Sequence, residues 1–152
     1  MALEYPDVIF LHCSGYKSND SNYTNYFGKI YEARYLSGLA AGSLTESNKI
    51  GYVAAFPIPE VIRGINAFAN GVKEVNPNAT VEVVWTNTWF GPEEETQAAN
   101  ALLEAGADVL TQHQDSASTG IAAEAAGAKW IGYHTGYGCL LYTSDAADDR
   151  RC

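Results

Sequence analysis

Apolar positions along the chain follow two periods in turn. Short apolar runs bounded by Gly, Pro or Asn are typical of buried strands, and apolar residues three and four positions apart are typical of a helix face. The clearest helical face carries Val61, Ile65, Phe68, Val72 and Val75. The predicted strands cover residues 7–13, 49–54, 81–85, 109–111 and 130–133, and the predicted helices cover residues 27–44, 59–75, 91–105 and 117–126.

Strands that alternate with helices through short connections indicate right-handed βαβ units. We therefore expect an α/β fold, with a parallel sheet covered by helices on both faces. Gly106 and Gly127 each separate a helix from a strand, as helix C-cap residues do. The small residues Gly38 and Gly42 are expected to let their helix lie close on the sheet.

The remaining segments are predicted to be polar surface. Residues 17–25 are rich in Ser and Asn and are expected to form a loop. Four basic residues are scattered and are interpreted as solvated, namely Lys17, Lys29, Arg34 and Lys49. The two periods stop at Cys139, and residues 139–152 resemble the translation of a sequencing-library adapter more than a native tail. We therefore leave that segment out of the fold, which makes Cys13 the only cysteine treated as native.

Composition narrows the classes of function. The 152 residues include 18 acidic and 9 basic side chains, and the formal net charge of -9 argues against a nucleic-acid partner. No run of 18 apolar residues predicts a membrane span, and no leader segment is seen at the start. The hydrophobic fraction of 47% excludes a disordered chain.

Ligands of open α/β sheets bind beyond the carboxyl ends of the strands. The candidate ligand-binding residues at those ends are His12, Ser14, Tyr16, Phe56, Trp89, Phe90, Gln112, His113, Asp115 and His134. Aromatic rings stack on flat ligands, while short polar groups fix their orientation. A purine base or nucleoside suits this mixture, and a sugar also remains open.

Each candidate also has a structural interpretation. Phe56 can be a hydrophobic staple before its helix, and Trp89 and Phe90 can pack at the edge of the core. Asp115 can cap a helix, and His113 can be a satisfied core histidine. An enzyme is the main alternative, with His113 and Asp115 in acid–base roles. However, the chain lacks a nucleophile elbow, phosphate-binding glycine motifs and metal-ligand spacings, so we expect no catalytic residues, cofactor or metal.

Several motifs in order resemble one known family. They are RYLSGLAAG (34–42), NKIGYV (48–53), FPIPEV (56–61), VNP (75–77), WTNTW (85–89), GADV (106–109) and QHQD (112–115). This pattern is similar to the basic membrane protein (BMP) family, the purine nucleoside receptor-like (PnrA-like) substrate-binding lipoproteins of ABC transporters. The resemblance spans roughly residues 5–135.

The resemblance implies a type I periplasmic-binding-protein fold, with two lobes and a ligand cleft between them. Residues 1–45 would end the first lobe, 46–48 would form the hinge crossing and 49–138 would begin the second lobe, so the chain is expected to be truncated at both ends. The implied protein is not an enzyme. It captures a purine base or nucleoside for uptake, with permease subunits as partners, and it works in the cell envelope, held by a lipid anchor.

By the same resemblance, residues 12–16 would line the cleft from the first lobe, and the other candidates would line it from the second. One position departs from the family pattern, because Gly136 stands where we expect an acidic residue after residues 133–135. A sensor lobe of a receptor or regulator is a further alternative, since such proteins share the binding lobes.

Overall fold

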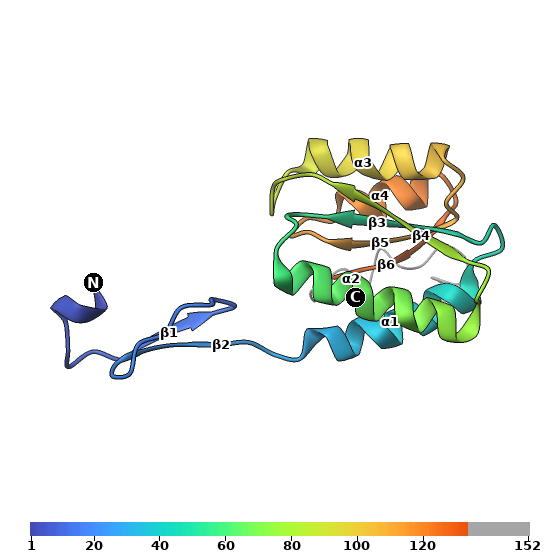
Figure 1. The fold of residues 1–152 in the computed structure, drawn as a ribbon. Helices are drawn as coiled ribbons and strands as arrows, with labels where there is room; N and C mark the ends of the chain where they lie inside the picture. Colours follow the sequence, from blue (N-terminus) through green and yellow to red (C-terminus); the bar gives the residue numbers. More distant parts are fainter. Residues whose placement is uncertain (134–152) are drawn as a thin grey trace, which may run out of the picture. The chain divides into compact units, whose positions relative to one another are not determined.

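The structure is a computed structural model that describes residues 1–133 (Figure 1). It divides into two compact units, one formed by residues 1–30 and the other beginning at Tyr31. The predictions that concern His134, Gly136 and the segment 139–152 lie outside the described residues.

The first unit contains a short 3₁₀ helix, η1 (Ala2–Glu4), and two parallel strands, β1 (Phe10–Cys13) and β2 (Tyr23–Tyr26). The predicted strand over 7–13 is therefore shorter, and the prediction that it is buried is wrong, since Leu11 is 65% exposed. Within this unit β1 pairs only with β2, and no α-helix covers it. The predicted loop over 17–25 overlaps β2, whose Tyr and Thr residues favour a strand.

The second unit is built on a four-stranded parallel sheet, as predicted. Its strands are β3 (Lys49–Ala54), β4 (Thr80–Trp85), β5 (Val109–His113) and β6 (Lys129–Ile131), in the order β4-β3-β5-β6. Ile50 lies opposite Val81 on one side and Val109 on the other, so the strand ends line up across the sheet. We call the two borders of this sheet the carboxyl edge and the amino edge, after the strand ends that form them.

Helices cover both faces of the sheet, which confirms the α/β prediction. They are α1 (Ile30–Leu44), α2 (Pro59–Val75), α3 (Pro92–Glu104) and α4 (Ser118–Ala125). Figure 1 shows α1 and α2 on one face and α3 and α4 on the other. The first face buries Val61, Phe68 and Val72 of α2, and the second buries Leu102 against Leu110 and Trp130. The helical spacing of Ala98, Ala101 and Ala105 predicts that all three face inward, but Ala101 and Ala105 are exposed.

The glycine face of α1 packs on α2, not on the sheet as expected. A Cβ added to Gly38 would lie 2.0 Å from the Phe68 carbonyl oxygen, and one added to Gly71 would lie 2.1 Å from the Tyr35 carbonyl oxygen. Only glycine permits so close an approach of two helix backbones. From Tyr31 onward, α1 belongs to the same compact unit as the sheet. The assignment of residues 1–45 and 49–138 to two lobes stays a prediction.

The connections at the amino edge are held by hydrogen bonds. The Asp108 carboxylate accepts bonds from Thr45 Oγ1 (2.6 Å) and from the backbone N–H groups of Glu46 (2.6 Å) and Ser47 (2.8 Å). Partial burial would raise the pKa of Asp108, but these bonds outweigh it and lower the pKa below its ordinary value. Lys129 Nζ donates to the Leu44 carbonyl at 2.8 Å. Gly106 and Gly127 have φ values of +95° and +70°, as their predicted C-cap roles require.

Candidate ligand-binding site

Four rings follow one another along the carboxyl edge, and we call this set the aromatic wall. Its members are Phe56, Trp89, His113 and Tyr133. Ring centroids lie 5.5 Å apart for Phe56 and Trp89, 6.1 Å for Trp89 and His113, and 4.4 Å for His113 and Tyr133. Each ring stands at or just after the end of a different strand, from β3, β4, β5 and β6 in turn. Three of the four were predicted as ligand-binding residues, and the structure brings those three together.

Backbone hydrogen bonds fix the loops that carry these rings. The Asn87 N–H donates to the Ala55 carbonyl, which holds the turn after β4 against the end of β3. Asn87 adopts a left-handed φ of +57°, which Asn tolerates better than most residues. The Asp115 N–H donates to the Trp89 carbonyl at 2.9 Å, which ties the loop after β5 to the same turn. The wall is therefore held by the sheet and not by a free loop.

The rings differ in how far they reach solvent. Trp89 is 38% exposed, Phe56 and Tyr133 are half-buried, and His113 is buried. The rings are tilted to one another by 56°, 60° and 45° at ordinary aromatic contact distances, and the partly exposed ones offer apolar surface to a flat ligand. The arrangement therefore suits stacking.

A carboxylate joins the wall at its most buried ring. Glu60, in the first turn of α2, places Oε1 3.5 Å from His113 Nε2. Burial raises the pKa of Glu60, while the positive charges of Arg63 and Arg34 act in the opposite direction. The imidazole and the carboxylate together supply hydrogen-bonding groups beside the rings. From the sequence, Glu60 is expected only to complement the positive end of the helix that begins at Pro59.

Arg34 is the residue that sequence reasoning placed wrongly. It was expected on the solvated surface, yet it is only 2% exposed. Its Nη2 donates to the Gln112 carbonyl at 2.7 Å, and its Cζ lies 4.3 Å from the centroid of the Tyr133 ring. Burial lowers the pKa of Arg34 from its ordinary value, against the favourable effect of Tyr52, Tyr133 and Glu60. Arg34 lies four residues before Gly38 and so shares the helix face of Gly38 and Gly42, and this spacing is the sequence signal that indicates its burial.

The glutamines of the QHQD motif serve as scaffold. Gln112 Nε2 donates to the carbonyls of Gln114 (3.2 Å) and Ser116 (2.5 Å), and Gln114 Nε2 donates to Thr86 Oγ1. Both side chains are fully buried. The amide nitrogen of Gln112 thus holds the loop after β5. That Gln112 also binds ligand stays a prediction.

Glu95 completes this scaffold from α3. It accepts hydrogen bonds from the Gly91 N–H (3.1 Å) and from Ser116 Oγ (2.6 Å). The side chain is fully buried, and this burial raises the pKa of Glu95, although both hydrogen bonds oppose the rise. A buried carboxylate therefore connects the start of α3 with the loop that follows β5.

The other predicted residues are not members of the aromatic wall. Phe90 and Asp115 are exposed near the carboxyl edge. His12, Ser14 and Tyr16 belong to the first unit, where His12 Nδ1 lies 2.8 Å from Tyr23 Oη. These five stay predictions, as does His134. For the enzyme alternative, the carboxylate within ion-pair distance of the His113 imidazole is that of Glu60, while Asp115 is exposed.

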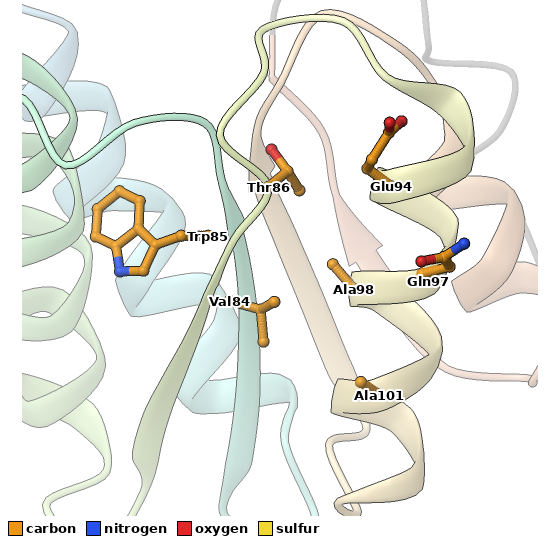
Figure 2. Close-up of a pocket in the computed structure, with 7 residues that line it drawn as sticks. All are labelled: Val84, Trp85, Thr86, Glu94, Gln97, Ala98 and Ala101. Carbon is orange, nitrogen blue, oxygen red and sulfur yellow. The ribbon is translucent and has the colours of Figure 1, made fainter.

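A separate hollow lies beside the edge strand β4. It has a volume of about 330 Å³, and its lining residues are Val84, Trp85, Thr86, Glu94, Gln97, Ala98 and Ala101. Figure 2 shows Val84 directed toward α3 and Trp85 directed away from it. No sequence motif pointed to this place. Within residues 1–133 no three His, Cys, Asp or Glu side chains gather as metal ligands do, and no helix there is long and apolar enough to span a membrane.

Comparison with known proteins assigns the chain to a family. Residues 1–141 match the family model described as ABC transporter substrate-binding protein PnrA-like. A proposed ABC transporter glucose-binding protein of Haloferax volcanii is 51% identical over 138 residues, which are 91% of this chain and 35% of that protein. A purine-binding protein of Brucella abortus is 44% identical over 116 residues, which are 76% of this chain and 33% of that protein.

A solved structure agrees with the sequence matches. The ABC transporter solute-binding protein of Conexibacter woesei superposes with a TM-score of 0.66 at 30% identity, over 86% of this chain and 45% of that one. The chain thus spans about a third of the curated relatives it matches and under half of this solved structure. From the extent of the family match and these similarities, the chain belongs to the family of PnrA-like ABC transporter substrate-binding proteins.

Proposed function

We propose that the full-length protein captures a purine base or nucleoside between two lobes and delivers it to the permease of an ABC importer. The observation that carries this proposal is the aromatic wall at the carboxyl edge. The protein would act in the cell envelope, in the periplasm or on the outer face of the plasma membrane, held there by a lipid anchor. Hinge closure over the ligand would signal its presence to the permease.

The scaffold role of the glutamines favours a flat ligand over a sugar. Sugar hydroxyls need many hydrogen-bonding groups, and the amide nitrogens of Gln112 and Gln114 are already occupied inside the unit. The wall retains ring faces together with one polar pair, His113 and Glu60. Such a set supports stacking of a base, with the polar pair bonding its edge. In this proposal His12, Ser14 and Tyr16 line the cleft from the first lobe.

The name of one relative supports a purine ligand and the name of another supports glucose, so the experiment includes both. We expect the thermal unfolding midpoint of the full-length protein to rise with adenine, adenosine or guanosine and to stay unchanged with glucose. A rise with glucose alone would replace the purine proposal by a sugar one. No rise with any of the four compounds would overturn the ligand class.

Replacement of Trp89 tests the wall itself. Trp89→Ala should weaken purine binding about tenfold, because one base–aromatic stack contributes about 1–3 kcal/mol. Tyr35→Ala is the matched control, since Tyr35 is an aromatic residue of similar exposure, 36% against 38%, outside the wall. Isothermal titration measures both variants. Equal affinities of Trp89→Ala and the wild type would remove the wall from the site.

A further inference from the structure

Behind the aromatic wall lies a cation that connects three strands. Arg34 Nη2 bonds the Gln112 carbonyl of β5, and Nη1 lies 3.5 Å from Thr111 Oγ1. The Thr111 hydroxyl in turn donates to the Ile131 carbonyl of β6 at 2.8 Å. The guanidinium also lies near the Tyr52 ring of β3, at 5.5 Å from Cζ to the ring centroid. One side chain of α1 thus reaches the carboxyl ends of β3, β5 and β6.

Stability alone is a poor reason for this arginine. A buried charge loses its hydration, and apolar residues of similar volume often stabilise a core as well or better. Among residues 1–133 no carboxylate lies within ion-pair distance of the Arg34 guanidinium, and its Nε has no hydrogen-bond partner there. A buried arginine without a carboxylate partner among residues 1–133 therefore indicates a role other than stability.

We propose that Arg34 is a positioning residue of the binding site, which sets the plane of the Tyr133 ring and so the geometry of the His113–Tyr133 half of the wall. The contact geometry supports this role, because a planar guanidinium stacks on a ring while its N–H groups bond a fixed carbonyl. The Cζ-to-centroid distance of 4.3 Å is a close cation–π contact. The next ring, His113, lies 4.4 Å from Tyr133 with a tilt of 45°.

A lysine in place of Arg34 cannot make both of these contacts. Its ammonium is a compact point charge, which lacks the plane that stacks on a ring and the fork that bonds a carbonyl at the same time. Arg34→Lys therefore keeps the charge and most of the hydrocarbon stem but removes the orienting contact. A comparison of Arg34→Lys with Arg34→Gln separates the effect of the positive charge from the effect of the guanidinium geometry.

The first arm of the test needs no ligand. In protein labelled with ¹³C-tyrosine, the Tyr133 ring signal is assigned by its loss in Tyr133→Phe. We expect this signal to shift in both Arg34→Lys and Arg34→Gln and to stay in place in Arg63→Gln, which removes an exposed guanidinium from α2. An unmoved Tyr133 signal in both Arg34 variants would overturn the proposal.

The second arm rests on the proposed function and uses adenosine with the full-length protein. Arg34→Lys should bind adenosine at least tenfold more weakly than the wild type. Val72→Ala, a buried substitution on α2, should keep wild-type affinity even though its thermal midpoint falls. Equal affinity of Arg34→Lys and the wild type would contradict the positioning role. If the wild type binds no purine, the proposed function fails, and the tyrosine signal still decides the role of Arg34.

Discussion

The two edges of the parallel sheet are built in opposite ways. At the amino edge, the Asp108 carboxylate accepts three hydrogen bonds from the connection between α1 and β3, and Lys49 and Lys129 donate to backbone carbonyls. At the carboxyl edge, rings follow one another, and within residues 1–133 the buried atoms Arg34 Nε and Tyr52 Oη have no hydrogen-bond partner.

Under the proposed function, this difference separates a structural edge from a binding edge. Polar groups that satisfy one another stabilise connections and leave little to offer a ligand. Ring faces and polar groups with remaining bonding capacity cost stability but can bind. The pKa values follow the same division, because the pKa of Asp108 is lowered and the pKa of Glu60 is raised. Four substitutions, two of them measured in a pH titration, can break or sharpen this contrast.

The largest loss of stability is expected from Glu95→Ala. The substitution leaves the Gly91 N–H and the Ser116 hydroxyl without their buried acceptor. A buried donor without a hydrogen-bond acceptor costs about 1–3 kcal/mol. The free energy of unfolding, measured by urea titration, should therefore fall by about 2–4 kcal/mol. Glu94→Ala, at an exposed neighbouring position, is the control. Equal stability of the two variants would show that Glu95 does not hold the loop after β5.

Asp108→Ala should have a smaller effect, confined to the amino edge. Loss of three hydrogen bonds at a partly exposed carboxylate should lower the free energy of unfolding by about 1–2 kcal/mol. Adenosine affinity of the folded protein should not change, because Asp108 stands at the edge opposite the wall. Urea titration and calorimetry measure the two quantities. A loss of affinity would contradict the separation of the two edges.

Much of this fold could be predicted because its signals are local. The strand β3 has the predicted bounds, and α2 starts at Pro59 as predicted, since both depend on apolar spacing and nearby Pro residues. The strand-end rule found Phe56, Trp89 and His113, because parallel strand ends meet at one edge whatever their sequence separation.

The predictions that failed depend on distant contacts. Burial of Arg34 requires residues 77 and 78 positions later in the chain. The inward turn of Gln112 requires β5 to continue to His113, two residues beyond its predicted end. The glycines of α1 signal close packing but not whether the partner is a sheet or another helix. Sequence spacing places Arg34 on the glycine face of α1, but it does not identify the partner in any of these three contacts.

The smallest expected effects are two pH dependences of opposite sign. For Asp108 the folded pKa lies below the unfolded value, so its contribution to stability is present above the unfolded pKa and is lost as pH falls through the folded pKa. For Glu60 the folded pKa is raised, so the folded state takes up the proton first and gains stability as pH falls through the folded pKa toward the unfolded one.

Two conservative variants separate these contributions. Asp108→Asn should reduce the loss of stability in acid, at pH values below the ordinary pKa of 3.8. Glu60→Gln should remove a gain that sets in above the ordinary pKa of 4.5. Urea midpoints measured from about pH 3 to pH 7 give both slopes. Slopes that change in the same direction in the two variants would contradict the contrast between the edges.

The position of a bound purine tests the central claim most directly. Nuclear Overhauser effects between adenosine base protons and protein side chains locate the base in the full-length protein. We expect contacts to the Trp89 indole and the His113 imidazole, and none to Ala101 in the hollow beside β4 (Figure 2). Contacts to Ala101 without contacts to Trp89 would contradict the assignment of the aromatic wall as the ligand site.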